Sequence, residues 1–287
     1  MKFQFIDINK HDNRISKMCE ILQGSPQGYY QWKNRGKSNR EQANEFLLLK
    51  IQEIHIKSRC NYGSPRITRV LNNDSIPCSQ PRVARIMRAN GIVSKTKRKF
   101  KATTNSKHNL PVAPNLVNQD FGVEGPNRLW VGDITYIDTD EGWLYFAKVM
   151  DGCNREIIGW AAEKRMKKEL VIKAMDRALL KRNPSIGVIF HSDRGSQYAS
   201  HDFRGQLKNN GIRQSMSGKG NCYDNAIAES FFKTLKSELT YHRRYKTRDE
   251  AKLDIFEYIE VFYNRERLHS ALDYKTPIEY GELQHVA

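Results

Sequence analysis

The stretch RLWVGDITYIDTDEGWLYFAKVMDGCNREIIGWAAE, residues 128–163, contains three runs of apolar, β-branched and aromatic residues. The runs cover 128–137, 142–151 and 155–163, and the short segments between them are rich in Asp, Gly and Asn. Runs of this composition, separated by turn-forming residues, predict three strands that pair antiparallel as a meander.

The segments that follow complete one domain. KKELVIKAMDRALLKR, residues 167–182, predicts an amphipathic helix, and SIGVIFHSD, residues 185–193, predicts a fourth strand at the edge of the sheet. A second helix is expected over 201–210, before a loop that contains glycine. Three strands, helix, strand and helix is the order of a ribonuclease H-like α/β domain, which we place at 119–287 together with C-terminal helices.

Three acidic residues stand in distinctive surroundings within this domain. Asp133 lies inside the first predicted strand, Asp193 follows the fourth strand in HSDRGSQY, and Glu229 lies on a predicted helix in NCYDNAIAESFFKTLKSE. Hard divalent cations prefer oxygen ligands, and two ions about 3.5–4 Å apart can clamp the attacking and leaving oxygens of a phosphodiester displacement. We therefore expect these three carboxylates to be catalytic and to hold two Mg²⁺ ions, with Mn²⁺ able to substitute.

The helix that carries Glu229 also carries two basic residues. A helical wheel places Glu229, Lys233 and Lys236 opposite the apolar stripe, where they would be available to a metal ion and to phosphate. The alternative is an ordinary surface pair between Glu229 and Lys233, which are four residues apart.

Other polar residues near these motifs have simpler interpretations. We interpret Asp138, Asp140 and Asp151 as turn residues and Asp224 as the N-cap of the Glu229 helix. His191, at a strand end, is expected to be structural. Tyr198 and Gln197 are considered as supporting residues or DNA contacts.

Positive charge is concentrated in the first part of the chain. The 287 residues carry a formal net charge of +16, with 48 Lys and Arg against 32 Asp and Glu. Residues 1–110 contain 22 basic and 7 acidic residues, whereas the remainder contains 26 and 25. A basic segment joined to a charge-balanced domain is typical of a DNA-binding arm on an enzyme.

This basic segment divides into three predicted parts. Residues 1–35 form a helical segment, with one helix over 12–23, and residues 95–118 form a basic linker that lies along DNA. Residues 36–94 form a helix-turn-helix-like domain with a helix from Glu41 to about Ile56. In this domain Ser64 and Ser79 are expected to be N-caps, and Gly91 is expected to end the last helix. The predicted DNA contacts are Arg82, Arg85, Arg88, Lys97, Arg98 and Lys99.

The arginine contacts have an alternative interpretation. Arg82, Arg85 and Arg88 recur every three residues opposite Val83, Ile86 and Met87, as on a recognition helix in the major groove. They could equally form a solvated basic face.

The helix expected from Glu41 to about Ile56 is predicted to bury four apolar residues, namely Phe46, Leu47, Ile51 and Ile54.

Cysteine usage and hydropathy indicate the compartment. The five cysteines are scattered without a C-x-x-C pair, which argues against a disulfide framework or a structural zinc site and favours a reducing cytoplasm. The sequence contains no apolar run near the 18 residues that a membrane span needs, and we expect no membrane partner.

The motifs together resemble a known family. YGSPRI, WVGDITYI, HSDRGSQY, SMSGKGNCYDNAIAESFFKTLKSE and YNRERLHSAL resemble the OrfB transposases of the IS-three family of bacterial insertion sequences, from about Ile15 to Tyr280. The catalytic part is also similar to retroviral integrases. The resemblance implies a triad at Asp133, Asp193 and Glu229, with a basic residue, Lys236, seven positions later. The His-His-Cys-Cys zinc module of retroviral integrases is not matched, so no zinc is expected.

This resemblance implies a transposase that cleaves element ends and joins their 3′-hydroxyls to another phosphodiester. Double-stranded DNA is the expected partner, the chain is expected to be a homo-oligomer on DNA, and an upstream OrfA protein or fusion is a possible further partner. A nucleoid-associated cytoplasmic location is expected. Two alternatives stay open: a nuclease of the same fold that never joins strands, and a transposase-derived DNA-binding regulator.

Overall fold

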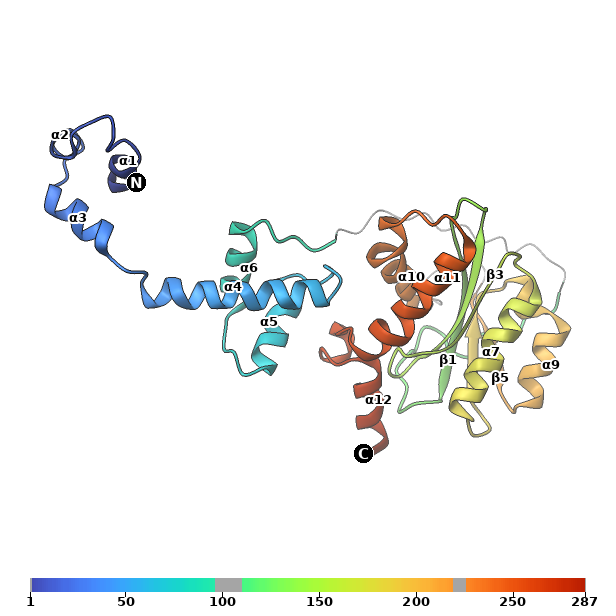
Figure 1. Cartoon of the computed structure of the whole chain (residues 1–287). Helices are drawn as coiled ribbons and strands as arrows, with labels where there is room; N and C mark the ends of the chain where they lie inside the picture. The colour runs from blue at the N-terminus through green and yellow to red at the C-terminus, as the bar shows by residue number, and fades with distance from the viewer. Residues whose placement is uncertain (1, 96–109, 219–225, 287) are drawn as a thin grey trace.

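The structure, a computed structural model, describes residues 2–95, 110–218 and 226–286. Three parts follow one another along the chain (Figure 1). A small group of helices lies at one end, a second helical group lies in the middle, and a five-stranded sheet covered by helices lies at the other end.

The first helical group has its own small core. The predicted helix over 12–23 is present as α2, whereas α1 was not predicted. Tyr29 is fully buried against Phe3 and Trp32, and its hydroxyl donates to Asp7 Oδ1 at 2.7 Å. The ring of Tyr29 therefore packs the core of this helical group. The three helices are α1 (Lys2–Ile8), α2 (Ile15–Ile21) and α3 (Pro26–Asn34).

The second group contains the predicted helix, turn and helix. Ser38 begins α4 with a capping box that involves Glu41. Two expected details were wrong: Ser64 is the first residue of α5 rather than its cap, and Phe46 is 52% exposed. Gly91, with φ +65, follows the C-cap of α6 as expected. The helices are α4 (Asn39–Lys57), α5 (Ser64–Asn73) and α6 (Gln80–Ala89).

The sheet confirms the predicted meander and corrects its edge. Its order is β3-β2-β1-β4-β5, with β1, β2 and β3 antiparallel and with β4 parallel to both β1 and β5. The fourth strand was wrongly expected at an edge, because the short strand β5 beyond it was not predicted. The strands are β1 (Leu129–Ile137), β2 (Leu144–Asp151), β3 (Ile157–Glu163), β4 (Ile189–Ser192) and β5 (Arg213–Met216).

Helices cover both faces of this sheet (Figure 1). One face packs against α7, α8 and α9, and the other packs against α10 and the C-terminal helices. Gly159 lets α7 approach β3 closely, since a Cβ there would lie 2.2 Å from the carbonyl oxygen of Ala174. The helices of the first face are α7 (Lys168–Arg182), α8 (Ser196–Ala199) and α9 (His201–Asn209).

The C-terminal segment completes the second face. Its π-helical turn η3 packs Tyr258 and Phe262 into the core beside α10. Its elements are α10 (Ala226–Glu238), η2 (Thr240–His242), α11 (Arg248–Phe256), η3 (Glu257–Tyr263), η4 (Ser270–Leu272) and α12 (Pro277–Val286).

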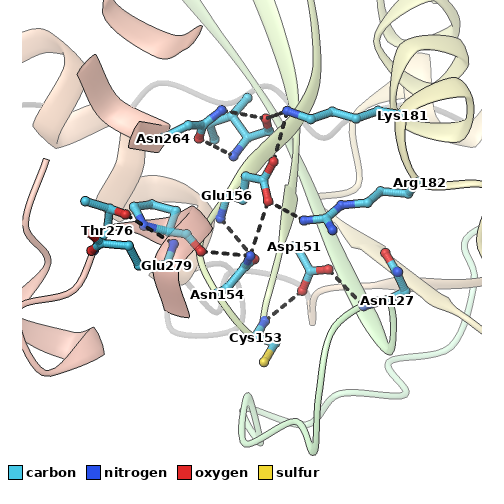
Figure 2. A network of polar contacts seen from close by, with 12 residues as sticks. Asn127, Asp151, Cys153, Asn154, Glu156, Lys181, Arg182, Asn264, Thr276 and Glu279 are labelled. Atoms are coloured by element: carbon cyan, nitrogen blue, oxygen red, sulfur yellow. Dashed lines mark hydrogen bonds and ion pairs between the residues drawn. The ribbon is translucent and has the colours of Figure 1, made fainter. Parts of the chain in front are cut away.

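A polar network at the β2–β3 turn anchors this segment to the sheet (Figure 2). Asn264 bonds the backbone of Ile157 through both its oxygen and its nitrogen, each at 3.0 Å. Asn154 donates to the carbonyl oxygen of Pro277 at 3.0 Å, and buried Glu156 pairs with Lys181 at 2.9 Å and with Arg182. Buried groups of this kind stabilise a fold only when they are paired, so the turn and the segment depend on each other.

The middle helices are joined to the C-terminal segment by polar contacts. The Tyr62 hydroxyl donates to the carbonyl oxygen of Glu266 at 3.1 Å and accepts from the backbone N–H of Leu268 at 2.8 Å. Lys95 Nζ donates to the carbonyl oxygen of Glu238, the last residue of α10, at 3.1 Å. The motifs YGSPRI and YNRERLHSAL therefore meet at one joint.

None of the helices in the described ranges is long and apolar enough to span a membrane.

Candidate active site

Two of the predicted acids lie side by side because two neighbouring strands are parallel. Strand β1 pairs with β4 from Leu129–Ile189 to Val131–His191. The same register, continued by two residues, sets Asp133 beside Asp193. The carboxyl ends of parallel strands are where α/β folds place reactive groups, so the positions suit a site.

Backbone groups orient both carboxylates. The N–H of Ile134 donates to Asp133 Oδ1 at 2.8 Å, and the N–H of Gly195 donates to Asp193 Oδ1 at 3.0 Å. A Cβ at position 195 would lie 3.0 Å from the same Oδ1, which is closer than ordinary van der Waals contact. Glycine in the D-R-G motif therefore leaves room for the Asp193 carboxylate.

Glu229, the third acid, lies in the first turn of α10, the helix that covers the second face of the sheet. Its Oε2 lies 3.5 Å from Lys233 Nζ, and the Glu229 side chain is 32% exposed. The surface pair considered from sequence is therefore present, but Glu229 also lies within electrostatic range of Asp133. The charges of Asp193 and Glu229 thus both act on Asp133.

The surroundings of Asp133 disfavour its ionised form. Burial raises the pKa of Asp133, and the negative charges of Asp193 and Glu229 raise it further, against a lowering effect of Lys148. Within the described ranges, no three Asp, Glu, His or Cys side chains lie close enough together to hold a metal ion. The donors are nonetheless carboxylate oxygens alone, which is the set that Mg²⁺ and Mn²⁺ take.

Lys236 is not where the helical wheel placed it. It is only 5% exposed, and its ammonium lies 4.9 Å from the centre of the Tyr136 ring. Burial lowers its pKa to about 8, although the charge of Asp133 acts in the opposite direction. The expected exposed face was wrong at this residue because Phe232, which is 6% exposed, widens the apolar side of α10 next to it.

A second buried lysine, Lys148, was missed entirely. It is fully buried on β2, directly opposite Asp133 in the β1–β2 register. A lysine in the middle of an apolar strand was the signal that the sequence offered. The β1–β2 register places its side chain on the same face of the sheet as Asp133. Burial lowers its pKa, while the charge of Asp133 raises it.

Tyr198 is buried on the other face of the sheet, within electrostatic range of Asp133 and Asp193. Its ring is 2% exposed between Phe190 and Phe203, and its hydroxyl has no hydrogen-bond partner within the described residues. Burial and then the charges of Asp133 and Asp193 raise its pKa.

Two of the acids interpreted from the sequence as turn residues make structural contacts. Asp151 accepts from the backbone N–H groups of Asn127 at 2.8 Å and Cys153 at 2.9 Å, which confirms its interpretation as a turn residue (Figure 2). Asp140 pairs with Arg244 at 2.9 Å. His191 is buried with Nδ1 2.8 Å from Ser215 Oγ, so it has structural contacts, as expected. Asp224 lies outside the described residues.

The arginines of α6 divide into two kinds. Arg82 donates twice to Asn44 Oδ1, at 3.0 and 2.8 Å, and thereby ties α6 to α4. Arg85 and Arg88 are exposed. Lys97, Arg98 and Lys99 lie outside the described residues. A groove of about 540 Å³ between the two helices is lined by Asn39, Arg40, Ala43, Ser79, Pro81, Arg82 and Arg85.

Comparisons with known families match the two main parts of the chain. An integrase core domain matches residues 123–222, and a second integrase core domain model matches 229–284. An HTH-like domain matches residues 41–100. Together with the mixed five-stranded sheet, these matches define the class: a polynucleotidyl transferase with an integrase core of ribonuclease H-like fold, preceded by a helix-turn-helix-like region.

Two relatives narrow the class. A 31 kDa protein of insertion element IS600 from Shigella sonnei is 48% identical over 268 residues, which is 93% of this chain and 98% of that protein. Transposase InsF of insertion sequence IS3A from Escherichia coli strain K12 is 41% identical over 272 residues, 94% of each chain. The chain therefore belongs to the IS3 family of insertion-sequence transposases.

Similar solved structures are more distant. A simian T-cell lymphotropic virus intasome chain aligns with a TM-score of 0.47 and 15% identity over 80% of this chain and 74% of that chain. The HTLV-2 integrase catalytic core domain, solved in complex with magnesium, aligns with a TM-score of 0.41 and 15% identity over 55% and 97%. Family membership rests on the relatives, and it favours a transposase over a simple nuclease or a DNA-binding regulator.

Proposed function

We propose that this chain binds the ends of an insertion sequence, cleaves their 3′ strands and joins the freed 3′-hydroxyls to another phosphodiester, using Asp133, Asp193 and Glu229. The proposal is supported by the register that sets Asp133 on β1 beside Asp193 after β4, and by the charges of Asp193 and of Glu229 on α10, both of which act on Asp133. Each carboxylate comes from a different element, so the site depends on the folded domain.

The donor set suits two Mg²⁺ ions, with Mn²⁺ as a substitute. We assign Asp133 to both ions, Asp193 to the first and Glu229 to the second. When bound, the ions would activate the attacking oxygen and neutralise charge on the leaving 3′ oxygen. The raised pKa of Asp133 supports this assignment, since converging carboxylates gain most from a cation.

The remaining residues of the site position groups rather than exchange protons. The backbone N–H groups of Ile134 and Gly195 hold one oxygen of each aspartate. Lys233 and Lys236 would meet the DNA end next to the scissile phosphate, with Lys236 released from its place beside Asp133 and Tyr136. A lysine stem is long and flexible enough for such a movement.

DNA binding is assigned to the basic residues 1–110. The exposed Arg85 and Arg88 would read or contact DNA from α6, and Lys97, Arg98 and Lys99 would follow the backbone. Arg82 is assigned a smaller part, because its guanidinium is committed to Asn44. The net charge of this segment supports the assignment.

The partners follow from this reaction. Double-stranded DNA would supply both the element ends and the target, and two ends require a homo-oligomer or another assembly that holds them together. An upstream OrfA protein, separate or fused, is proposed as a further partner. The reaction places the chain in the bacterial cytoplasm, at the nucleoid.

One experiment separates this function from its alternatives. The purified chain is incubated with labelled element ends, target DNA and Mg²⁺, and cleaved and joined products are resolved on a denaturing gel. The proposal predicts both products. Cleaved product alone, with 3′ ends that persist, would support a nuclease, and tight end binding without either product would support a regulator.

A further inference from the structure

Lys148 is a buried charge whose contacts do not explain it. It is 0% exposed, and its one described hydrogen bond is a long contact of 3.5 Å to the carbonyl oxygen of Val131. The rings of Phe231 and Phe232 lie 5.9 and 5.7 Å from its Nζ. Cation–π contacts offset part of the cost of burying an ammonium, but an unpaired buried ammonium remains costly.

The nearest opposite charge is Asp133. The two residues are directly opposite in an antiparallel pair, which puts their side chains on one face with Cβ atoms roughly 4.5–5.5 Å apart. No acidic group in the described parts of the chain lies within 4.0 Å of Lys148, so the two act through their fields and not through an ion pair. Arg155 adds a repulsive charge to Lys148.

The site as a whole carries as many lysines as acids. Lys148 and Lys236 both act on Asp133 from buried positions, and Lys233 pairs with Glu229 at 3.5 Å. The family motif accounts for Lys236, whereas Lys148 belongs to no motif and comes from a different element. Its burial on the Asp133 face therefore calls for a role inside the site.

We propose that Lys148 is the resident counter-ion of Asp133: its ammonium balances this carboxylate in the metal-free enzyme and lowers the affinity of the site for a divalent cation. It is a positioning residue, since it would touch neither DNA nor the reacting atoms. The inference rests on the proposed assignment of Asp133 as a metal ligand. A single charge about 6 Å from a divalent ion, at the dielectric constant of water, changes affinity roughly tenfold.

The test is a metal titration of the 287-residue chain without DNA. Melting temperature is followed against Mn²⁺ and Mg²⁺ for wild type, Lys148→Met and the control Lys173→Met, which removes an exposed lysine of α7 that pairs with Glu163. The expected result is a midpoint about tenfold lower in Lys148→Met and unchanged in Lys173→Met. An unchanged or higher midpoint in Lys148→Met would overturn the inference.

A second measurement tests the inference without metal, in case Lys148→Met alone folds poorly. In metal-free protein, Lys148→Met should be less destabilising, or more stabilising, in the Asp133→Asn background than in the wild-type background, because only the wild-type background keeps the carboxylate that Lys148 balances. An equal change of melting temperature in the two backgrounds contradicts the inference. If wild type shows no metal-dependent stabilisation, the proposed metal site fails, whereas the metal-free comparison still measures the electrostatic coupling of Lys148 with Asp133.

Discussion

The joint between the middle helices and the catalytic domain should be sensitive to acid through His269. Arg267 Nη1 lies 3.1 Å from His269 Nε2, and the same guanidinium makes contacts of 2.7 to 3.2 Å with the Glu238 carboxylate. A guanidinium can only donate, so His269 must accept through Nε2 and be neutral. Burial, and then the charge of Arg267, lower the pKa of His269 to about 2.

The sign and size of the effect follow from this lowered pKa. An unfolded histidine takes up a proton near pH 6.5, which the folded protein refuses until about pH 2. The unfolded state therefore binds more protons below pH 6.5, and stability falls as the pH falls through that window. At pH 5 the loss is about 2 kcal/mol. For a chain of 287 residues that melts as one unit, this corresponds to a drop of roughly 3 °C in melting temperature.

The assay compares melting at pH 7.5 and pH 5.0 for three proteins. His269→Gln keeps an acceptor for Arg267 but cannot take up a proton, so it should lose less stability on acidification than wild type by the amount above. His201→Gln, at a fully exposed side chain, should behave as wild type. The reasoning is refuted if His269→Gln shows the same dependence on pH as wild type.

Three further outcomes are expected. Gly159→Ala should lower the melting temperature by several degrees, because the added Cβ would overlap the α7 backbone. The control Gly205→Ala, in open space on α9, should leave the melting temperature unchanged or raise it by reducing the entropy of the unfolded chain. An unchanged melting temperature for Gly159→Ala would contradict the close packing of α7 on β3. Tyr198→Phe should melt no lower than wild type, since its hydroxyl has no hydrogen-bond partner among the described residues, and a loss above about 1 kcal/mol would indicate an undetected bond. Arg88→Ala should reduce the salt dependence of DNA binding without loss of stability, whereas Arg82→Ala should destabilise the helical domain. Calorimetry measures the stability of each variant, and DNA titrations at several salt concentrations measure the salt dependence. The reverse pattern would contradict the assignment of Arg88 to DNA and of Arg82 to helix packing.

The strands and helices with strong local patterns were predictable from sequence. Strands β1 to β3 and helices α7 and α9 combine clear periodicity with turn residues at their ends. Strand β5 was missed because RQSM has four residues and little apolar character. Without β5, the fourth strand was placed at an edge. Parallel neighbours come from distant residues, so only the fold reveals that β4 is internal.

Parts of the site were equally hidden from local patterns. The acids were found because each lies in a distinctive motif, but the positions of the lysines depend on packing. Lys236 lies at the border of a stripe that Phe232 widens, and Tyr136 from β1 covers it. Phe46 shows the same limit on α4, where a second apolar face stays exposed. Lys148 required the strand register before its relation to Asp133 could be seen.

The central claim, that three carboxylates form one metal-dependent site for cleavage and joining, is tested most directly by single-turnover strand transfer with conservative variants. Asp133→Asn, Asp193→Asn and Glu229→Gln are assayed with labelled element ends and Mg²⁺, and DNA affinity is measured on the same preparations. The account predicts that each variant loses cleavage and joining while binding element ends within a few-fold of wild type. Near-wild-type joining by any one of the three, at normal DNA affinity, would contradict it.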